Sequence, residues 1–553
     1  MDVTNSQSWS PAILNYVKEF AADFSQVDNI EGKSIESDDQ ASRRLLQYLG
    51  SDEADAMAPV ALDASHPISD YFISSSHNTY LWGNQLYGKA STKAYQKVLE
   101  RGCRCVEIDV WDGDDSDSDT SDSSADSDSD AENEGEIKKL SRRFKKKMGL
   151  SRSKPETKPT DKPASASSPS EHEGVGSADL RRTVSKTEPR VLHGYTATKE
   201  ISFRAVCATI RDYAFATSLE VHTCPAQQQI MVDIIRDLWA PYLVDLNAVT
   251  GHEISLPTLE SLRKKILIKV KYTAPEVAAQ NPGPAVVSSN ADPESGSEGE
   301  GESREVQEAP VKKSHIITAL ASMGVYTRGC HFKDFDQPEA KLPNHIFSLS
   351  ESKIIEVHKL VALNWQYINA ATMLNQAMFH ATGGWVLKPE GYRSFHRAQS
   401  QISALDRGKL DLTIELLAGQ DIGPADKKLR LYVRSELHIE DMEELNGGSL
   451  PEGGSTKEGQ IKAVTELGTA GRSPDFRRQL LQFRVDGVAE ELTFVRFKVM
   501  DDDTFSRDNL VAWACFKLSR LQTGIRKIRL YDCEGQQTNG MLLVRISKRL
   551  EIE

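Results

Sequence analysis

The chain has 553 residues, of which 39% are apolar and 27% charged, and its formal net charge is −14. This length allows two or three domains, and the negative charge argues against nucleic acid as the main partner. We find no N-terminal signal pattern and no apolar run of the roughly 20 residues that cross a bilayer, so we expect a soluble, intracellular protein. The seven cysteines are odd in number and scattered, which favours reduced thiols over a disulfide framework.

Polar segments divide the chain into ordered blocks. Residues 113–187 and 273–313 lack apolar periodicity and cannot bury enough surface to offset chain entropy, so we predict that both are disordered. Residues 446–475 are also polar and are predicted to form a long loop. The expected divisions are an N-terminal helical segment, two halves of one domain joined by an acidic linker, and a C-terminal domain: 1–65, 66–272, 273–313, 314–393 and 405–553.

Two fold classes follow from the pattern of these blocks. Before residue 393, short apolar strands such as "CRCVEIDVW" and "KILIKVKY" alternate with helical stretches such as "ISFRAVCATIRDYAF". This alternation predicts one α/β barrel that is split by the inserts. From residue 405 onward, segments such as "KLDLTIELLAGQ" and "LTFVRFKVMDDD" are short strands with turn signals between them, which predicts an all-β sandwich.

A set of oxygen ligands is spread over three of the predicted strands and turns. Glu107 and Asp109 are two residues apart on one strand, so both carboxylates project from the same face and repel each other unless a cation or proton lies between them. Asn78 and Glu220 would add a neutral oxygen and a third carboxylate. An oxygen-only set favours calcium or magnesium over zinc. The alternative is that Glu107 and Asp109 end an edge strand in solvent.

Lysine and histidine side chains also lie on or next to the predicted strands. Lys269 and Lys271 share one face of a strand, where two ammonium groups suit a multiply charged anion such as a phosphorylated substrate, or form a solvated face. His77 and His193 each lie between an apolar strand and a polar turn. Such a pair could move protons in an in-line attack at phosphorus, although a single buried histidine is more often structural.

Several long motifs resemble eukaryotic phosphoinositide-specific phospholipase C. "HPISDYFISSSHNTYLWGNQL", "GCRCVEIDVWDG", "VLHGYT", "SLEVH" and "LRKKILIKVK" resemble its X half, and "VALNWQ" and "GGWVLKPEGYR" resemble its Y half. The terminal sandwich resembles the C2 domain of that family. The resemblance implies a TIM-type barrel split into X and Y halves and followed by a C2 sandwich, closest to the delta-like enzymes of fungi. Residues 1–65 contain no convincing EF-hand loop and are a candidate remnant of one.

The resemblance also implies a role for each candidate residue. His77 would stabilise the pentacoordinate phosphate, His193 would act as general acid on the diacylglycerol oxygen, and Glu107 is a candidate base for the inositol 2-hydroxyl. The implied calcium ligands are Asn78, Glu107, Asp109 and Glu220. The implied holders of the ring phosphates are Lys269, Lys271 and Ser348. The 2-hydroxyl would attack the 1-phosphate and release diacylglycerol, and the cyclic phosphate would then be hydrolysed to inositol 1,4,5-trisphosphate.

The expected partners are phosphatidylinositol 4,5-bisphosphate and an anionic membrane surface. The segment "IKKLSRRFKKKMGL" is a candidate basic amphipathic helix that could dock on anionic lipid, or else a solvated linker or nuclear-import signal. In the sandwich, Asp501, Asp503 and Asp508 are candidate calcium ligands by resemblance to C2 loops. We therefore expect a cytoplasmic protein that is peripheral on the inner face of the plasma membrane, with a nuclear pool as a further expectation.

Two stretches of the family pattern are missing. The strand that ends at Glu220 follows a helix almost directly, so we expect it to be too short to pair with both neighbours. The Y half lacks the segment that in the family carries an arginine on a ring phosphate and a tyrosine against the inositol ring. The leading hypothesis is an active calcium-dependent enzyme, and the alternative is a catalytically inactive relative that binds lipid or acts as a scaffold. A lyase that needs no metal is disfavoured by the oxygen ligands.

Overall fold

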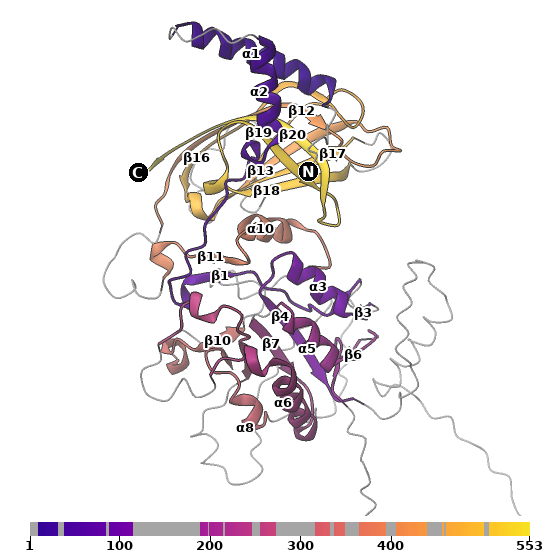
Figure 1. Cartoon of the computed structure of the whole chain (residues 1–553), viewed down its shortest axis with the longest axis vertical. Coiled ribbons are helices and arrows are strands. Elements are labelled where there is room, and N and C mark those ends of the chain that lie inside the picture. The colour runs from indigo at the N-terminus through magenta and orange to yellow at the C-terminus, as the bar shows by residue number, and fades with distance from the viewer. Residues whose placement is uncertain are drawn as a thin grey trace, which may run out of the picture.

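The computed structural model describes most of the predicted domains. The described residues are 9–30, 38–83, 88–113, 188–196, 198–213, 216–245, 255–271, 316–331, 337–348, 364–393, 405–439, 456–457, 460–502 and 508–552. Within them a barrel and a sandwich lie end to end along the longest axis, and a pair of helices lies at the sandwich end (Figure 1). The predictions for residues 114–187 and 273–313, and for part of 446–475, fall outside the described residues. In the described part of 446–475 the expectation of a long loop is wrong, because Thr456–Lys457 and Gln460–Val464 are strands that pair in the sandwich.

Parallel strands form the centre of the barrel, in the order β4–β7–β8–β9–β10. Their bounds are β4 Cys105–Trp111, β7 Ala216–Val221, β8 Ile268–Lys271, β9 Arg328–His331 and β10 His345–Ser348. β1 (Tyr71–Ile73) continues into a bridge between Ser75 and Cys105, which places it beside the start of β4. β11 (Trp385–Leu387) pairs antiparallel with β1. The predicted alternation of parallel strands and helices is confirmed.

Helices cover the outside of these strands because one face of each is apolar. Their bounds are α3 Thr92–Glu100, α5 Phe203–Arg211, α6 Pro225–Trp239 and α8 Thr318–Ala321. In α5 the buried residues recur at helical spacing, from Phe203 through Val206 and Cys207 to Ile210. They share one core with Val106, Ile108 and Val110 of β4. Because side chains alternate along a strand, this packing turns Glu107 and Asp109 to the opposite face of β4, toward the barrel interior.

The strand before Glu220 is complete. β7 has six residues, which pair with β4 along their whole length and with β8 at Thr217 and Ser218. The expectation of a strand too short to pair with both neighbours is therefore wrong, because Ala216 and Thr217 belong to the strand rather than to the preceding turn.

The other gap in the family pattern lies between β10 and β11. In the part of the chain that the structure describes, β10 pairs with β9 alone, and β11 pairs with β1 alone. Two short hairpins border the barrel elsewhere, formed by β2 (Leu81–Trp82) with β3 (Lys89–Ala90) and by β5 (Arg190–Val191) with β6 (Ile201–Ser202). β5 pairs with the end of β4.

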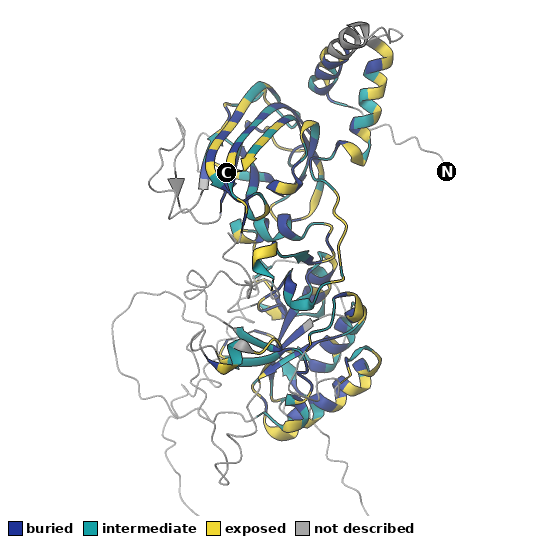
Figure 2. Ribbon diagram, turned by 90° about the vertical axis from the view of Figure 1, so that its left-hand side faces the viewer, coloured by how far each residue is buried: buried dark blue, intermediate teal, exposed yellow. Residues whose placement is uncertain are grey.

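The C-terminal domain is an antiparallel sandwich, as predicted. Its strands are β12 Gly408–Gln420, β13 Leu431–His438, β14 Thr456–Lys457, β15 Gln460–Val464, β16 Asp475–Val488, β17 Phe494–Asp501, β18 Asn509–Lys517, β19 Gly524–Tyr531 and β20 Gln537–Ile552. They pair in the order β14–β15–β13–β17–β18–β19–β20–β12–β16. β18 and β19 meet only at Trp513 and Tyr531. Buried and exposed residues alternate along much of the long strands (Figure 2), and most of the buried ones form one apolar core.

The N-terminal helices pack on the sandwich. α1 (Pro11–Ile30) and α2 (Asp38–Gly50) contribute Phe20 and Leu49 to an apolar cluster with Leu417, Ala418 and Leu543 of the sandwich. A β-bulge between Leu416 and Ala418 in β12 supplies this second apolar surface. None of the described helices, including the 20-residue α1, is long and apolar enough to cross a membrane.

α10 (Ala370–Phe379) joins the two domains. It lies between barrel and sandwich (Figure 1), and its Met373 and Ala377 share an apolar cluster with Trp513 and Cys515 of β18. The Arg520 guanidinium also spans the junction, donating to the carbonyl oxygens of Ala58 and His380 at 2.7 to 3.1 Å.

Candidate active site

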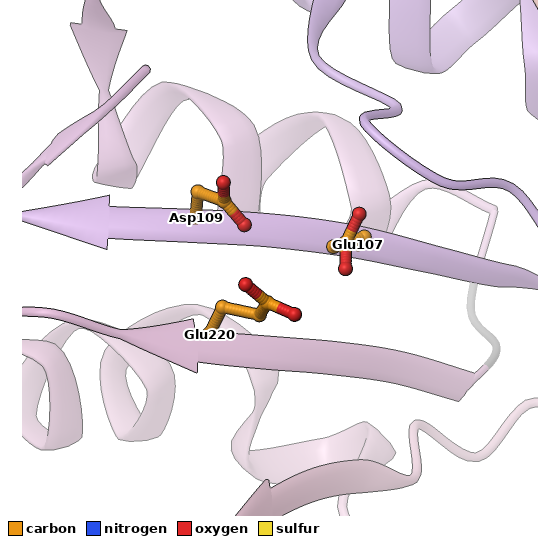
Figure 3. Close-up of side chains that lie close together, drawn as sticks. All are labelled: Glu107, Asp109 and Glu220. Carbon is orange, nitrogen blue, oxygen red and sulfur yellow. The ribbon is translucent and has the colours of Figure 1, made fainter. Parts of the chain in front are cut away.

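Strand pairing assembles an acidic group at one end of the barrel. In the parallel pair of β4 and β7, Asp109 lies opposite Glu220, and Glu107 is two residues earlier on the same face. Oxygen atoms of these three carboxylates lie within 4.8 Å of one another (Figure 3). Among the described residues, this is where at least three potential metal-binding side chains converge. The register between β4 and β7 thus unites residues that are more than a hundred positions apart.

Desolvation and mutual repulsion disfavour the ionised form of the carboxyl groups in this cluster. Burial raises the pKa of Asp109 well above its ordinary value, and the neighbouring Glu107 and Glu220 raise it further. Glu220 keeps 52% of its side chain exposed, yet partial desolvation and Glu107 likewise raise its pKa. Asp109 Oδ1 is buried and has no hydrogen-bond partner. A divalent cation bound by oxygen would satisfy that atom and offset the repulsion, so these residues fit calcium as the implied ion.

Asn78 is held against the acidic group by its backbone and its side chain. Its backbone N–H donates to Glu107 Oε2 at 2.7 Å, and its φ of 49° lies in the left-handed region, which asparagine tolerates better than most residues. The Tyr80 hydroxyl lies 2.8 Å from Asn78 Oδ1 and 2.7 Å from Asp109 Oδ2, so it links the two expected metal ligands. Asn78 therefore presents its carboxamide oxygen beside the carboxylates, as the resemblance implies.

Tyr80 is a site residue that the sequence analysis missed. It is fully buried, and burial together with Asp109 raises the pKa of its hydroxyl far above the ordinary value. The group therefore stays protonated and acts as a hydrogen-bond donor. Its only signal in the sequence was its place two residues after Asn78 in "HNTYL", and because residues 77–80 form a bend and a turn, strand alternation could not have placed its hydroxyl.

The two predicted catalytic histidines lie at this same end of the barrel. His77 is exposed for 46% of its side chain, and its Nε2 lies 3.7 Å from Glu107 Oε2. His193 follows β5, where Thr196 Oγ1 donates to its carbonyl oxygen at 2.7 Å. Burial lowers the pKa of His193, and His77 lowers it further, so the two imidazoles lie within electrostatic reach of each other. His193 Nδ1 is buried without a hydrogen-bond partner.

An aromatic group beside His193 was also missed. The Trp111 ring stacks on His222, with 4.2 Å between ring centroids, and meets the edge of Tyr195. A Cβ atom on Gly194 would lie 2.0 Å from the Trp111 ring, so only glycine allows the indole to pack against the backbone next to His193. The motif "VLHGYT" contained this glycine, but nothing in the sequence showed which aromatic ring would meet it.

The predicted phosphate-binding residues lie on the neighbouring strands. Lys269 is half-buried and Lys271 is exposed on β8, whose burial alternates as predicted. Lys269 lies close enough to Glu220 to favour the ionised form of that carboxyl. Desolvation and Glu107 have larger effects, so the pKa of Glu220 is still raised. Ser348 ends β10, and its side chain lies outside the described part of the structure.

The candidate calcium ligands of the sandwich are engaged by other groups. Asp501 Oδ1 accepts a hydrogen bond from the Arg430 backbone N–H at 2.8 Å, and the Arg430 guanidinium lies 2.9 Å from Asp502. Asp508 Oδ2 accepts a hydrogen bond from the Tyr432 hydroxyl at 2.6 Å. Asp503 lies outside the described residues.

Comparison with known proteins matches both halves of the barrel. The family model "Phosphatidylinositol-specific phospholipase C, X domain" matches residues 64–272, and the corresponding Y-domain model matches residues 357–391. The crystal structure of S. officinalis PLC21 superposes with a TM-score of 0.63 at 19% identity, over 100% of this chain and 64% of that one, which shows the likeness of fold.

Curated relatives carry names of one kind. The chain is 26% identical to "1-phosphatidylinositol 4,5-bisphosphate phosphodiesterase 1" of Candida albicans, over 85% of this chain and 46% of that protein. It is 25% identical to "1-phosphatidylinositol 4,5-bisphosphate phosphodiesterase delta-1" of Rattus norvegicus, over 91% of this chain and 63% of that protein. The matches thus span between about half and two thirds of the length of these relatives.

Proposed function

Since the chain belongs to the phosphatidylinositol-specific phospholipase C family, we propose that it hydrolyses phosphatidylinositol 4,5-bisphosphate in a calcium-dependent reaction. The products would be diacylglycerol and inositol 1,4,5-trisphosphate, formed through a cyclic phosphate. The observation that carries this proposal is the convergence of Glu107, Asp109 and Glu220 within 4.8 Å, at the end of the barrel where His77 and His193 also lie. The repulsion among these carboxylates is unfavourable for a purely structural site.

Because these residues fit calcium, the metal can be given a place in the proposed reaction. Bound by Glu107, Asp109, Glu220 and the Asn78 carboxamide, calcium would lower the pKa of the inositol 2-hydroxyl and offset charge on the phosphorane. Glu107 takes the proton of that hydroxyl in this scheme, as the hydroxyl oxygen attacks the 1-phosphate. The Asn78 N–H and the nearby His77 fix the orientation of the Glu107 carboxylate.

The two histidines complete the proton transfers. His77, half exposed at the mouth of the site, donates to a phosphate oxygen and stabilises its charge. His193 gives its proton to the diacylglycerol oxygen as the P–O bond breaks. Its pKa is low beside His77 in a buried position, and the negative charge of the phosphodiester favours protonation when substrate binds. In the second step His193 takes a proton from water, and Glu107 returns one to the 2-hydroxyl.

The proposed substrate and membrane partners are inferred from positively charged side chains. Lys269 and Lys271 place two ammonium groups on the strand next to Glu220, which suits the phosphates of the inositol ring. We propose that the protein acts at an anionic membrane surface, on the inner face of the plasma membrane. The basic segment expected to assist docking lies outside the described residues.

A second candidate is a catalytically inactive member of the family that binds lipid or acts as a scaffold. The observation that favours it is the edge of β10, which in the described residues pairs on one side only and lies where a barrel strand would follow. A closed barrel has no spare strands, so an unpaired edge there could leave the ring-phosphate site incomplete.

The two candidates differ in a single measurement. We would express the full chain and measure release of soluble inositol phosphate from vesicles that contain phosphatidylinositol 4,5-bisphosphate, with calcium and with a chelator. An active enzyme turns over in calcium only, and His77→Ala abolishes turnover while the matched control His66→Ala, before the start of β1, retains it. A folded, monomeric wild-type chain without turnover would favour the inactive relative.

A further inference from the structure

We propose that Trp365 and Gln366 are positioning residues for the catalytic loop, defined here as residues 74–78, which carries His77 and Asn78. They belong to the Y-half motif "VALNWQ", whereas the loop belongs to the X half. The inference rests on the proposed function for the roles of His77 and Asn78. It adds residues to the machinery that touch neither substrate nor metal and act through the loop.

Contacts from the Y half follow the catalytic loop along its length. Before the loop, β1 pairs with β11, and the Ser74 N–H then donates to the Gly384 carbonyl oxygen at 3.0 Å. Trp365 Nε1 donates to the Ser75 carbonyl oxygen at 3.1 Å, and Gln366 Nε2 donates to the Asn78 carbonyl oxygen at 2.9 Å. The Y half thus satisfies polar backbone groups at both ends of the loop and within it.

The X half holds the opposite side of the same loop. The Ser76 N–H donates to the Cys105 carbonyl oxygen at 2.8 Å, and the Asn78 N–H donates to Glu107. Asn78 keeps a left-handed φ, a strained conformation that persists only where the surroundings determine it. Gln366 helps to hold Asn78 in this conformation, because its hydrogen bond to the Asn78 carbonyl oxygen fixes the peptide that follows Asn78.

Trp365 is itself fixed by a cation from the X half. The Arg101 guanidinium lies 5.0 Å from the centre of the indole ring, and its Nη2 donates to Gln376 Oε1 of α10 at 2.8 Å. The indole therefore has a defined place between Arg101 and the loop, instead of a free surface position. This arrangement relates the loop to α10, the helix that joins the barrel to the sandwich.

The shortened Y half would therefore serve to hold the catalytic loop in place. The two Y-half motifs recognised in the sequence, "VALNWQ" and "GGWVLKPEGYR", are those whose residues contact the catalytic loop and β1. The Y half would therefore shape the metal and phosphate site through the loop, whatever it contributes to binding of the inositol ring.

The test compares three glutamine variants in the full chain. Gln366→Met removes the donor while keeping the length of the side chain, and Gln366→His retains an N–H donor without adding charge at pH 8. Gln522→Met is the matched control, because Gln522 Nε2 also donates to a backbone carbonyl, that of Asp55, at the sandwich. The readouts are the dissociation constant for terbium, used as the calcium probe, and hydrogen exchange of the loop amides in chelator.

We expect Gln366→Met to weaken terbium binding about tenfold, which is typical when a group that orients a metal ligand is lost, and to speed exchange of the loop amides. Gln366→His and Gln522→Met should keep both values of the wild type. Wild-type terbium affinity and loop exchange in Gln366→Met would overturn the proposal.

Failure of the proposed function would show itself separately. A wild-type chain that turns over no lipid but gives this pattern of variants would overturn the activity and support the positioning role. A wild-type chain that binds no terbium would overturn the metal site, and loop exchange in chelator would still decide whether Gln366 holds the loop.

Discussion

The sandwich and the barrel bury carboxylates in opposite surroundings. In the sandwich, burial alone would raise the pKa of Glu436, yet His438, Lys498 and Arg496 hold it well below its ordinary value. Arg496 Nε lies 2.8 Å and Lys498 Nζ 2.7 Å from its oxygens. In the barrel, Asp109 is also buried but faces two further carboxylates, and its pKa is raised. A paired carboxylate is structural, whereas a repelling group is prepared for a cation.

The largest effect should come from breaking the paired carboxylate. Glu436→Gln leaves Arg496 and Lys498 buried without their counter-charge, so we expect the sandwich to lose about 3 to 5 kcal/mol of unfolding free energy. Urea unfolding followed by hydrogen exchange of the sandwich amides measures the loss. Glu551→Gln removes an exposed partner of Arg549 and serves as the control, with an expected change below about 0.5 kcal/mol. Equal effects of the two substitutions would show that the Glu436 cluster is not structural.

The same pair predicts opposite dependences on pH. The folded-state pKa of Glu436 is lowered, so its contribution is present above the unfolded value of 4.5 and is lost as pH falls toward the folded value. The folded-state pKa of Asp109 is raised, so without metal its ionisation destabilises the barrel increasingly as pH rises through that value. Unfolding of the two domains in chelator, measured from pH 7 down to pH 4, should show the barrel gaining stability while the sandwich begins to lose it.

Calcium should stabilise the barrel more than the sandwich. At a hundredfold excess over its dissociation constant, an ion that binds only the folded state adds about 2.7 kcal/mol. Asp109→Asn should abolish this gain and, in chelator, raise the unfolding temperature of the barrel because it removes a repelling charge. Calorimetry with calcium and with chelator checks both parts. A variant destabilised in chelator would contradict the repulsion inferred for this group.

Gly194→Ala should impair catalysis without impairing metal binding. The new Cβ would displace the Trp111 ring and with it the backbone next to His193, so we expect turnover to fall about a hundredfold. Terbium affinity should stay within about twofold of the wild type, because the three heavy atoms nearest to the new Cβ all belong to the Trp111 ring and not to an expected metal ligand. Gly50→Ala, where a Cβ meets nothing within 4 Å, is the matched control. Full activity of Gly194→Ala would mean that the indole does not position His193.

The smallest effect should come from the sandwich loop with Asp501 and Asp508. Calcium there would have to displace the contacts from Arg430 and Tyr432, so we expect binding at least about tenfold weaker than in the barrel. Asp501→Asn should then leave the number of tightly bound calcium ions per chain unchanged in isothermal titration calorimetry. Loss of a tight site in this variant would show that the sandwich binds calcium as strongly as the barrel.

Much of the fold and of the candidate site followed from local patterns. Alternating apolar residues predicted β4 and the long strands of the sandwich, because one face of a strand must be buried. The same alternation placed Glu107 and Asp109 on one face. The strand before Glu220 was misjudged, since Ala216 carries little β signal and the first residues of β7 join the strand through pairing with β4.

The sequence by itself determined which chemical groups are present and which of them share a strand, because periodicity is a local property of the chain. Only the tertiary structure decided that Glu220 lies opposite Asp109, that Tyr80 links Asn78 to Asp109, and that Gln366 holds the loop from nearly three hundred residues away. These relations depend on the register between strands and on the packing of distant segments, which are set by the shape of the whole core.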